Sequence, residues 1–199
     1  QAQRIAGHAE QGTKIERVIR QLFERVDDND RNLYGESLEA CSTAGTAKTG
    51  FSRTGFCSDI RGDAGSHHIC LENIGADLSG RRTPSATGEE VAAPAAAPRP
   101  TFCDLTGQSS WCTTNSTECH PNKPGSETQK VCRRERWCVC QWAWANALNE
   151  LTRSEGPEEA CNRLKIDCSA TSLAAMRAYE SDKKYEDALK CLKQQCFHE

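Results

Sequence analysis

The predicted fold depends on one stretch of the chain, Arg136-Trp137-Cys138-Val139-Cys140-Gln141-Trp142-Ala143-Trp144-Ala145-Asn146-Ala147-Leu148-Asn149-Glu150-Leu151. This stretch contains three of the four tryptophans and neither glycine nor proline. Read as a helix, it places its apolar side chains on one stripe, made of Trp137, Trp144, Ala147, Leu148 and Leu151. Because aromatic side chains bury the most apolar surface, we expect this helix to form the centre of the core.

Two cysteines near the start of the stretch add a further expectation. On a helix with 3.6 residues per turn, Cys138 and Cys140 lie roughly 200° apart and point to nearly opposite sides. They should therefore have different partners, and the tryptophan helix should be tied down on two sides.

The N-terminal segment has the apolar spacing of a long amphipathic helix. Its apolar positions recur at steps of three and four residues, at Ile5, Ala9, Ile15, Val18, Ile19, Leu22, Phe23 and Val26 and again at Leu33, Leu38 and Cys41. The polar residues 27–30 are a weak point within this pattern. A helix over Gln1–Cys41 would be roughly 60 Å long, which predicts an elongated molecule.

Between residues 42 and 131 regular patterning almost disappears, and cysteines punctuate a polar sequence. Apolar residues between Cys70 and Gly80 are enough for a short helix. Residues 84–100 are rich in proline and alanine, which predicts an exposed, extended linker. We expect a single helical domain over residues 1–199, with 42–131 as a loop-rich insertion anchored by cysteines.

The C-terminal segment predicts three short helices. Gly156 should end the tryptophan helix, and Pro157 suits the first turn of the next one. A helix carrying Leu173, Met176 and Tyr179 follows, and then a last helix with Tyr185, Ala188, Leu189 and Leu192.

Composition indicates how the fold is stabilised. Hydrophobic residues make up 37% of the 199 residues and aromatic residues 6%, so the core is small for this length. The 13 cysteines predict disulfides and an oxidising compartment outside the cytosol, with one cysteine unpaired. They are Cys41, Cys57, Cys70, Cys103, Cys112, Cys119, Cys132, Cys138, Cys140, Cys161, Cys168, Cys191 and Cys196. The expected fold class is mainly α, an elongated disulfide-rich helical bundle with a loop-rich, cysteine-stapled insertion.

Other features agree with the secretory pathway. Asn115-Ser116-Thr117 is a glycosylation triplet, so Asn115 is a candidate glycan site. The chain starts at Gln1 with no signal peptide, as is typical of a mature secreted ectodomain. No apolar run approaches the ~20 residues that cross a bilayer, so membrane attachment is expected only through an anchor outside this sequence.

The sequence argues against several classes of activity. The net charge of −3 and the scattered Lys and Arg residues do not predict nucleic-acid binding. No phosphate-binding loop, serine elbow or His-Glu-x-x-His helix is present, so we expect no enzyme and no cofactor. A Cys–His nucleophile is open by residue count, but we interpret His67-His68 as an exposed loop pair.

A zinc-stabilised intracellular module is the metal-binding alternative. Its candidate ligands are Cys103, Cys112, Cys119, His120, Cys132, Cys138 and Cys140. Structural zinc sites usually supply two close pairs of ligands. Here the spacing is irregular and Cys-x-x-Cys does not occur, so disulfides with no metal are favoured.

The order of a long N-terminal helix, a cysteine-rich polar insertion, a returning tryptophan helix and a disulfide-tied tail resembles the variant and invariant surface glycoproteins of trypanosomatid parasites. This resemblance implies an elongated bundle with residues 42–131 at its head and an anchor beyond Glu199. It also implies a cell-surface coat or antigen, or alternatively a receptor that binds a host protein through the head. An exposed apolar patch near Trp111 or Phe102 would favour the receptor. The oligomeric state is left open.

Overall fold

The fold is taken from a computed structural model of the whole chain. It describes residues 31–72, 74, 100–108, 112, 115–121, 123, 125 and 130–197. The helix expected over residues 1–30, and with it the elongated shape, lies outside the described residues. The same is true of the linker 84–99 and of Trp111.

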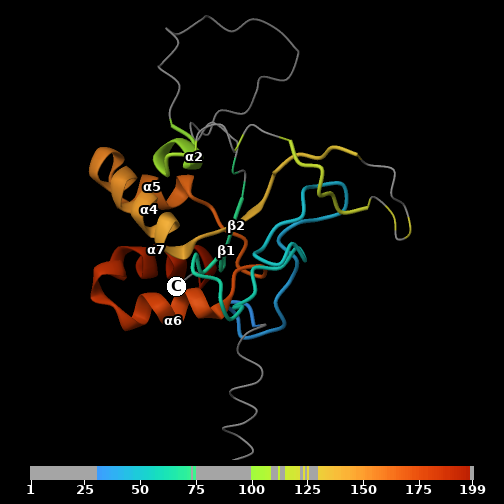
Figure 1. Ribbon diagram of the computed structural model, residues 1–199. Helices are drawn as coiled ribbons and strands as arrows, with labels where there is room; N and C mark the ends of the chain where they lie inside the picture. The colour runs from blue at the N-terminus through green and yellow to red at the C-terminus, as the bar shows by residue number, and fades with distance from the viewer. Residues whose placement is uncertain are drawn as a thin grey trace, which may run out of the picture.

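The described elements are two short strands and a series of helices. In chain order they are β1 (Ile69–Leu71), α2 (Phe102–Leu105), β2 (Trp137–Val139), α4 (Gln141–Glu155), α5 (Pro157–Arg163), α6 (Leu173–Ser181), the 3-10 helix η2 (Lys183–Tyr185) and α7 (Glu186–Cys196). We call residues 141–197 the helical part, and residues 31–72 with 115–140 the loop-rich part. Figure 1 shows the helices on one side of the two strands and most of the loops on the other. The mostly helical C-terminal part is confirmed.

The helices of the helical part begin and end at residues with suitable chemistry. α4 ends at Gly156, whose φ of 89° is one that glycine adopts without strain, and Pro157 starts α5. The Ser172 side chain accepts a hydrogen bond from the Ala174 N–H at the start of α6. Asp182 does the same for η2. The boundary at Gly156 and Pro157 agrees with the one expected from the sequence.

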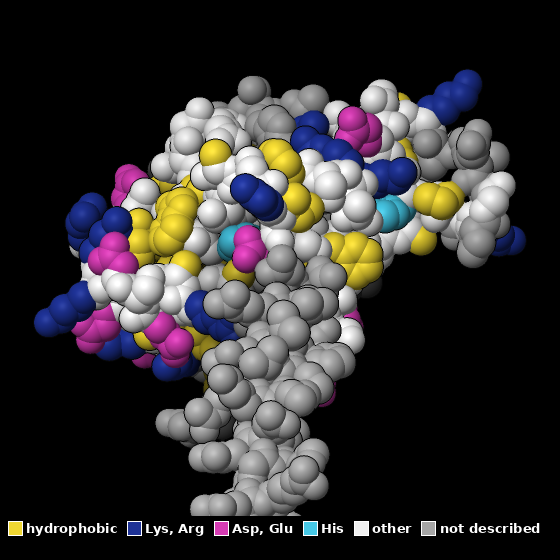
Figure 2. Space-filling model, turned by 60° about the horizontal axis from the view of Figure 1, so that its bottom comes forward, with side chains coloured by type: hydrophobic (Ala, Val, Ile, Leu, Met, Phe, Trp, Pro, Cys, Tyr) yellow, Lys and Arg dark blue, Asp and Glu magenta, His cyan; other side chains and the backbone are white. Residues whose placement is uncertain are grey.

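The core of the helical part is built around α4, as predicted. Trp144, Ala147, Leu148 and Leu151 are all buried. The Trp144 ring stacks on Tyr179 of α6 at 6.1 Å between centroids, and its Nε1–H donates to the Leu164 carbonyl at 3.3 Å. Outside this core, charged side chains of both signs cover the surface of the helical part, where Lys190 lies 2.8 Å from Glu186 (Figure 2).

The start of the tryptophan stretch is a strand and not a helix, which corrects the prediction. β2 pairs antiparallel with β1, with Cys70 opposite Cys138. Trp137, Cys138 and Val139 are all buried, so both faces of this strand are covered and no alternation of polar residues marks it. The extended backbone of Cys140, with ψ of 124°, separates the strand from α4. The argument that Cys138 and Cys140 lie on opposite sides of a helix is therefore wrong.

Residues 31–41 also depart from the predicted helix. The Asn32 carboxamide oxygen accepts hydrogen bonds from the Tyr34 and Glu36 N–H groups, which closes a turn. Gly35 lies in this turn with a φ of 78°. Asn32 also bridges to Ser172, so this segment packs on the start of α6 as an extended chain. The short helix expected after Cys70 is not formed at its start, because Cys70 and Leu71 belong to β1.

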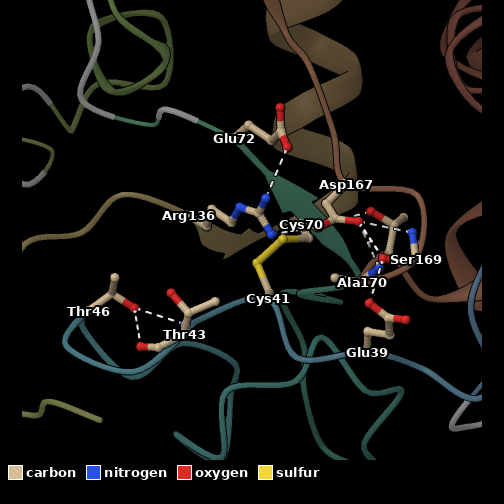
Figure 3. A network of polar contacts seen from close by, with 11 residues as sticks. Glu39, Cys41, Thr43, Thr46, Cys70, Glu72, Arg136, Asp167, Ser169 and Ala170 are labelled. Atoms are coloured by element: carbon tan, nitrogen blue, oxygen red, sulfur yellow. Dashed lines mark hydrogen bonds and ion pairs between the residues drawn. A yellow bond between two sulfur atoms is a disulfide. The ribbon is translucent and has the colours of Figure 1, made fainter. Parts of the chain in front are cut away.

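A polar network joins the loop-rich part to the helical part (Figure 3). The Arg136 guanidinium lies 2.6 Å from Asp167 and 3.4 Å from Glu72. Asp167 Oδ1 also accepts a hydrogen bond from the Ser169 N–H. The Ser169 hydroxyl lies 2.7 Å from Asp167 Oδ1 and 3.0 Å from Glu39 Oε2, and its one proton is donated to either carboxylate. These contacts fix the turn before α6 against the end of β1.

Disulfides hold the rest of the fold. The described residues include all 13 cysteines, of which twelve form six disulfides and Cys140 is free. The pairs are Cys41–Cys70, Cys57–Cys138, Cys103–Cys112, Cys119–Cys132, Cys161–Cys191 and Cys168–Cys196. The last two tie α5 and the turn before α6 to α7. Within the described residues, no helix combines the length and apolar character needed to span a membrane.

Candidate functional site: a cavity beside the free cysteine

A cavity of about 390 Å³ lies where the start of α4 meets β2, α2 and the loop-rich part. Its walls include three aromatic side chains, Phe51, Phe102 and Trp137. Polar groups reach it from Arg53 and His67, and the free Cys140 also lines it. The cavity thus combines apolar walls with a cation, an imidazole and a thiol, which is the mixture typical of small-molecule sites.

His67 is held by a turn that the local sequence encodes. Asp63 Oδ1 accepts a hydrogen bond from the Gly65 N–H at 3.1 Å, and Oδ2 accepts one from the His67 N–H at 2.8 Å. The His67 ring then folds back, so that its Nδ1 lies 2.7 Å from Asp63 Oδ1. A Cβ at Gly65 would lie 2.3 Å from the His67 Cε1, so the glycine makes room for the ring.

The Asp63 carboxylate orients the His67 ring. Burial alone would raise the pKa of Asp63, but hydrogen bonds from the backbone N–H and ring of His67 outweigh it, so this pKa lies below its ordinary value. An ionised carboxylate only accepts hydrogen bonds, so the His67 Nδ1 carries the proton. In the neutral imidazole the Nε2 then holds a free lone pair. The Asp63 side chain is 1% exposed and the His67 side chain 36% exposed, so the pair is buried at the carboxylate end and open at the ring.

Cys140 is placed at the N-cap of α4, the positive end of a 15-residue helix. Its carbonyl accepts the Trp144 N–H at 3.0 Å, while its side chain makes no capping hydrogen bond. The next residue fixes the helix against the turn described above, because the Gln141 N–H donates to the Ser66 carbonyl at 3.0 Å. The helix start that carries Cys140 and the turn that carries His67 are therefore joined directly.

Positive charge lies beside the Trp137 ring. The Arg53 guanidinium is 5.0 Å from the ring centroid and that of Arg134 is 5.6 Å from it. Burial, together with the nearby charge of Arg53, lowers the pKa of Arg134. Arg53 also lies 3.4 Å from Glu118, in an ion pair of which both side chains are about half exposed.

The adjacent residues His67 and His68 differ in exposure, so the interpretation of both as an exposed loop pair is wrong. His68 is buried, with its Nδ1 2.8 Å from Gln141 Oε1 and its Nε2 3.3 Å from Asp59. It positions the start of α4 from inside, whereas His67 faces the cavity. His120 was a candidate metal ligand, but its Nε2 lies 3.0 Å from the Ser42 hydroxyl oxygen. The ring packs against Gly55, where a Cβ would lie 2.7 Å from the same nitrogen.

The structure places most of the proposed zinc ligands in disulfides. Cys103 pairs with Cys112, Cys119 with Cys132, and Cys138 with Cys57, so these sulfurs are not thiolates. The Sγ atoms of Cys41, Cys57 and Cys138 lie within 4.8 Å of one another because two disulfides pack together in the interior. Asn115 is exposed, as a glycan site must be, and its glycosylation stays a prediction.

Asp63 and His67 were missed as a pair from the sequence, although a signal exists. An aspartate that caps a turn, a glycine two residues later and a histidine four residues later can close into an Asp–His pair. Phe102, near which an exposed apolar patch was considered, is 4% exposed and lines the cavity wall.

The comparisons with known proteins concern the part of the chain that carries Asp63 and His67. Residues 31–119 match a family described as "Uncharacterized protein conserved in bacteria (DUF2237)". No curated protein matches the chain. The chain is thus similar to this bacterial family over a segment that includes Arg53, Asp63 and His67, while Cys140 lies beyond it.

This match overturns the resemblance to trypanosomatid surface glycoproteins. That resemblance rested on an arrangement of helices and on no motif. Two parts of the arrangement are also absent, because residues 31–41 form a turn and an extended segment and not a helix, and Trp137–Val139 is a strand. The expected coat, antigen and host-receptor roles depended on the resemblance and stand untested.

Proposed function

We propose that this chain is an extracellular, disulfide-stabilised domain that binds a small anionic ligand with an aromatic ring. Binding, and not turnover, is the proposed activity. The observation that carries the proposal is the position of the Arg53 guanidinium, 5.0 Å from the Trp137 ring at the aromatic cavity. Six disulfides support an oxidising compartment.

The size and walls of the cavity suit such a ligand. Its volume of about 390 Å³ lies within the range of small-molecule sites. Phe102 comes from α2, Trp137 from β2 and Phe51 from a loop, so three separate segments supply flat apolar surface. Aromatic rings pack favourably against one another in offset or edge-to-face contacts.

The charge of the cavity favours an anion. Arg53 has Glu118 as an ion-pair partner, but both side chains are about half exposed, and exposed pairs contribute little free energy. A carboxylate in the cavity can therefore replace Glu118 as the partner of Arg53 at small cost. A guanidinium also offers a carboxylate two parallel hydrogen bonds.

The test compares phenylpropionate with phenylpropanol, which has the same ring and no charge. We expect phenylpropionate to raise the melting temperature and change tryptophan fluorescence, with phenylpropanol at least about tenfold weaker, since a hydrogen-bonded charge is lost. Arg53→Gln should remove this difference. Arg61→Gln is the matched control, because it removes the same charge from an exposed loop residue that does not line the cavity. Equal binding of the two compounds would contradict the proposal.

The compartment is tested separately by the intact mass of protein secreted from eukaryotic cells and alkylated with and without reduction. We expect twelve protected cysteines and modification only at Cys140. Thirteen free thiols with bound zinc would instead support the intracellular alternative.

A further inference from the structure

We propose that four buried cysteines form a structural zinc site when they are reduced, and that the two disulfides between them are the oxidised state of the same site. The four residues, which we call the four-sulfur cluster, are Cys41, Cys57, Cys70 and Cys138. The inference goes beyond the proposed binding function and does not rest on it. Of the zinc ligands considered from the sequence, this set contains only Cys138.

The first argument is the distance between sulfur atoms of two different disulfides. Cys41 is bonded to Cys70, and Cys57 to Cys138. The Sγ atoms of Cys41, Cys57 and Cys138 all lie within 4.8 Å of one another. Four thiolates at about 2.3 Å from a tetrahedral zinc ion are separated by about 3.8 Å. The sulfurs of the two disulfides are therefore close to the spacing that one zinc ion needs.

The second argument is the strand pairing that brings two of the ligands together. Cys70 of β1 lies opposite Cys138 of β2. The Cys70 N–H donates to the Thr171 hydroxyl at 3.1 Å, and the Cys138 N–H donates to the Thr49 hydroxyl at 2.7 Å. Because neither N–H bonds to the other strand, this is a non-hydrogen-bonded pair, in which opposite side chains lie closest. Two ligands are thus held by a fixed backbone.

The third argument is the surroundings of the four-sulfur cluster. All four cysteines are buried, and Ala170 packs with them, so the site is closed as structural zinc sites are. Asp167 holds a cation nearby (Figure 3). Its N–H donates to the Cys70 carbonyl at 2.9 Å, and its carboxylate lies 2.6 Å from the Arg136 guanidinium. Four thiolates around one Zn²⁺ carry a net negative charge, which a guanidinium offsets in part.

The two states interconvert by thiol–disulfide exchange with small dithiols. Cys138 lines the cavity, so a small dithiol that enters the cavity reaches the first disulfide. The Cys138 sulfur lies within 4.8 Å of that of Cys41, so its thiolate can open the second one. In total, two dithiols close to cyclic disulfides as the two protein disulfides become four thiols. These lose four protons and bind one Zn²⁺. In reverse, two small disulfides oxidise the four thiolates and the zinc ion is released.

The experiment uses the full chain with Cys140→Ser, which has no free thiol in its oxidised form. The protein is reduced without air by a phosphine, freed of it, titrated with Zn²⁺, briefly alkylated and mapped by mass spectrometry. We expect one tightly bound zinc ion. Zinc should slow alkylation of the four-sulfur cluster at least about 10-fold, because a thiolate bound to a metal is not free to react. The other cysteines should react equally fast with and without zinc.

Two double variants separate this site from zinc binding by a cysteine-rich chain in general. Cys70→Ser with Cys138→Ser should weaken zinc binding at least about 100-fold, since losing ligands costs more than losing a supporting contact. Competition with a chelator measures the affinity. Cys161→Ser with Cys168→Ser is the matched control, because it also removes one thiol from each of two disulfides. This control should bind zinc as tightly as the parent does.

Cobalt tests the geometry without any further substitution. Co²⁺ among four thiolates in a tetrahedron absorbs visible light strongly, whereas six-coordinate Co²⁺ with oxygen ligands absorbs weakly. We expect the strong bands in the reduced protein. A small disulfide should bleach them, and peptide mapping should then recover Cys41–Cys70 and Cys57–Cys138.

Three results would each overturn the inference. They are zinc protection of other cysteines, protection of the four-sulfur cluster that does not depend on zinc, and equal zinc affinity in the two double variants. The outcome is distinct from that of the proposed binding function, because phenylpropionate is tested on the oxidised protein. Phenylpropionate binding without zinc protection would leave only the binding function, and the reverse result would leave only the zinc site.

Discussion

The loop-rich part and the helical part of this molecule meet the same physical demands in different ways. The loop-rich part has two strands of three residues each and satisfies its backbone through isolated backbone contacts, such as the Lys48 N–H to the Glu118 carbonyl at 2.7 Å, and through buried polar side chains. The Cys138 N–H, for example, donates to Thr49 Oγ1 at 2.7 Å, and the Thr49 N–H donates to Ser42 Oγ. The helical part satisfies its backbone within the helices and packs Trp144 and Tyr179 between them. Where regular structure is short, specific side chains and covalent links must replace it.

The candidate site lies at the border between the two parts. His67 and Arg53 come from the loop-rich part, and Cys140 stands at the start of α4. A helix start and a turn fixed by Asp63 therefore both contribute to the cavity wall. Sites whose side chains are held by packing and hydrogen bonds are better preorganised than sites on free loops.

The largest expected effect follows from removing a long-range link in the loop-rich part. Cys57 and Cys138 are 81 residues apart, and the chain-entropy model gives a loss of about 4.5 kcal/mol when both become alanine. Cys103 and Cys112, which are nine residues apart, give about 2.6 kcal/mol. Urea unfolding of the two double variants measures the difference. Equal losses would show that restriction of the unfolded chain does not explain how these disulfides stabilise the fold.

A loss of similar or slightly smaller size is expected in the helical part. Trp144→Ala should lower the free energy of unfolding by about 3–5 kcal/mol, because it opens a cavity in the core and leaves the Leu164 carbonyl without its indole donor. Trp142, which is only half-buried, is the matched control, and Trp142→Ala should cost clearly less. A melting curve unchanged by Trp144→Ala would mean that packing around α4 does not stabilise this part.

A smaller effect tests the connection between the parts. Arg136 joins Glu72 of the loop-rich part to Asp167 of the helical part. Arg136→Gln should destabilise the protein by about 1 kcal/mol, since the Arg136 side chain is 37% exposed and partly screened by water. The loss should shrink in high salt. Lys190→Gln, which breaks an exposed pair within α7, should change stability very little, and an equal loss from both variants would argue against a special role for Arg136.

The smallest effect concerns pH. Burial, helped by the charge of Lys48, lowers the pKa of His120, so the folded protein prefers its neutral form. This contribution is fully present above the ordinary histidine pKa of about 6.5 and is lost as the pH falls from there through the folded-state value. In His120→Gln, the free energy of unfolding should lose the part of its pH dependence between about pH 7.5 and 5 that comes from His120. An identical pH dependence in the variant would assign the effect to another group.

The helical part was largely predictable because its signals are local. Gly156 and Pro157 mark one boundary, and Ser172 and Asp182 mark others through their own side chains. Apolar spacing also identified the buried face of α4. The strand Trp137–Val139 was missed because it is covered on both faces by distant segments, so the pattern that separates strand from helix is absent.

The candidate site was less predictable for a related reason. The Asp63–His67 turn is local and readable in principle, but the cavity that His67 faces is also lined by Cys140, which is more than 70 residues away in the chain. The odd number of cysteines showed that at least one must lack a partner within the chain, but it did not show which one. The trypanosomatid resemblance failed because an order of elements without a motif does not specify a family.

The sequence by itself determined the helices after residue 141, the small core and the dependence on disulfides, because spacing, caps and cysteine content act over a few residues or over the whole composition. Only the tertiary structure decided the pairing of the cysteines, the two strands and the cavity that brings Arg53, His67 and Cys140 together. These features join segments that are distant in the chain. They are stabilised by long-range contacts, which cannot be read from a local sequence pattern.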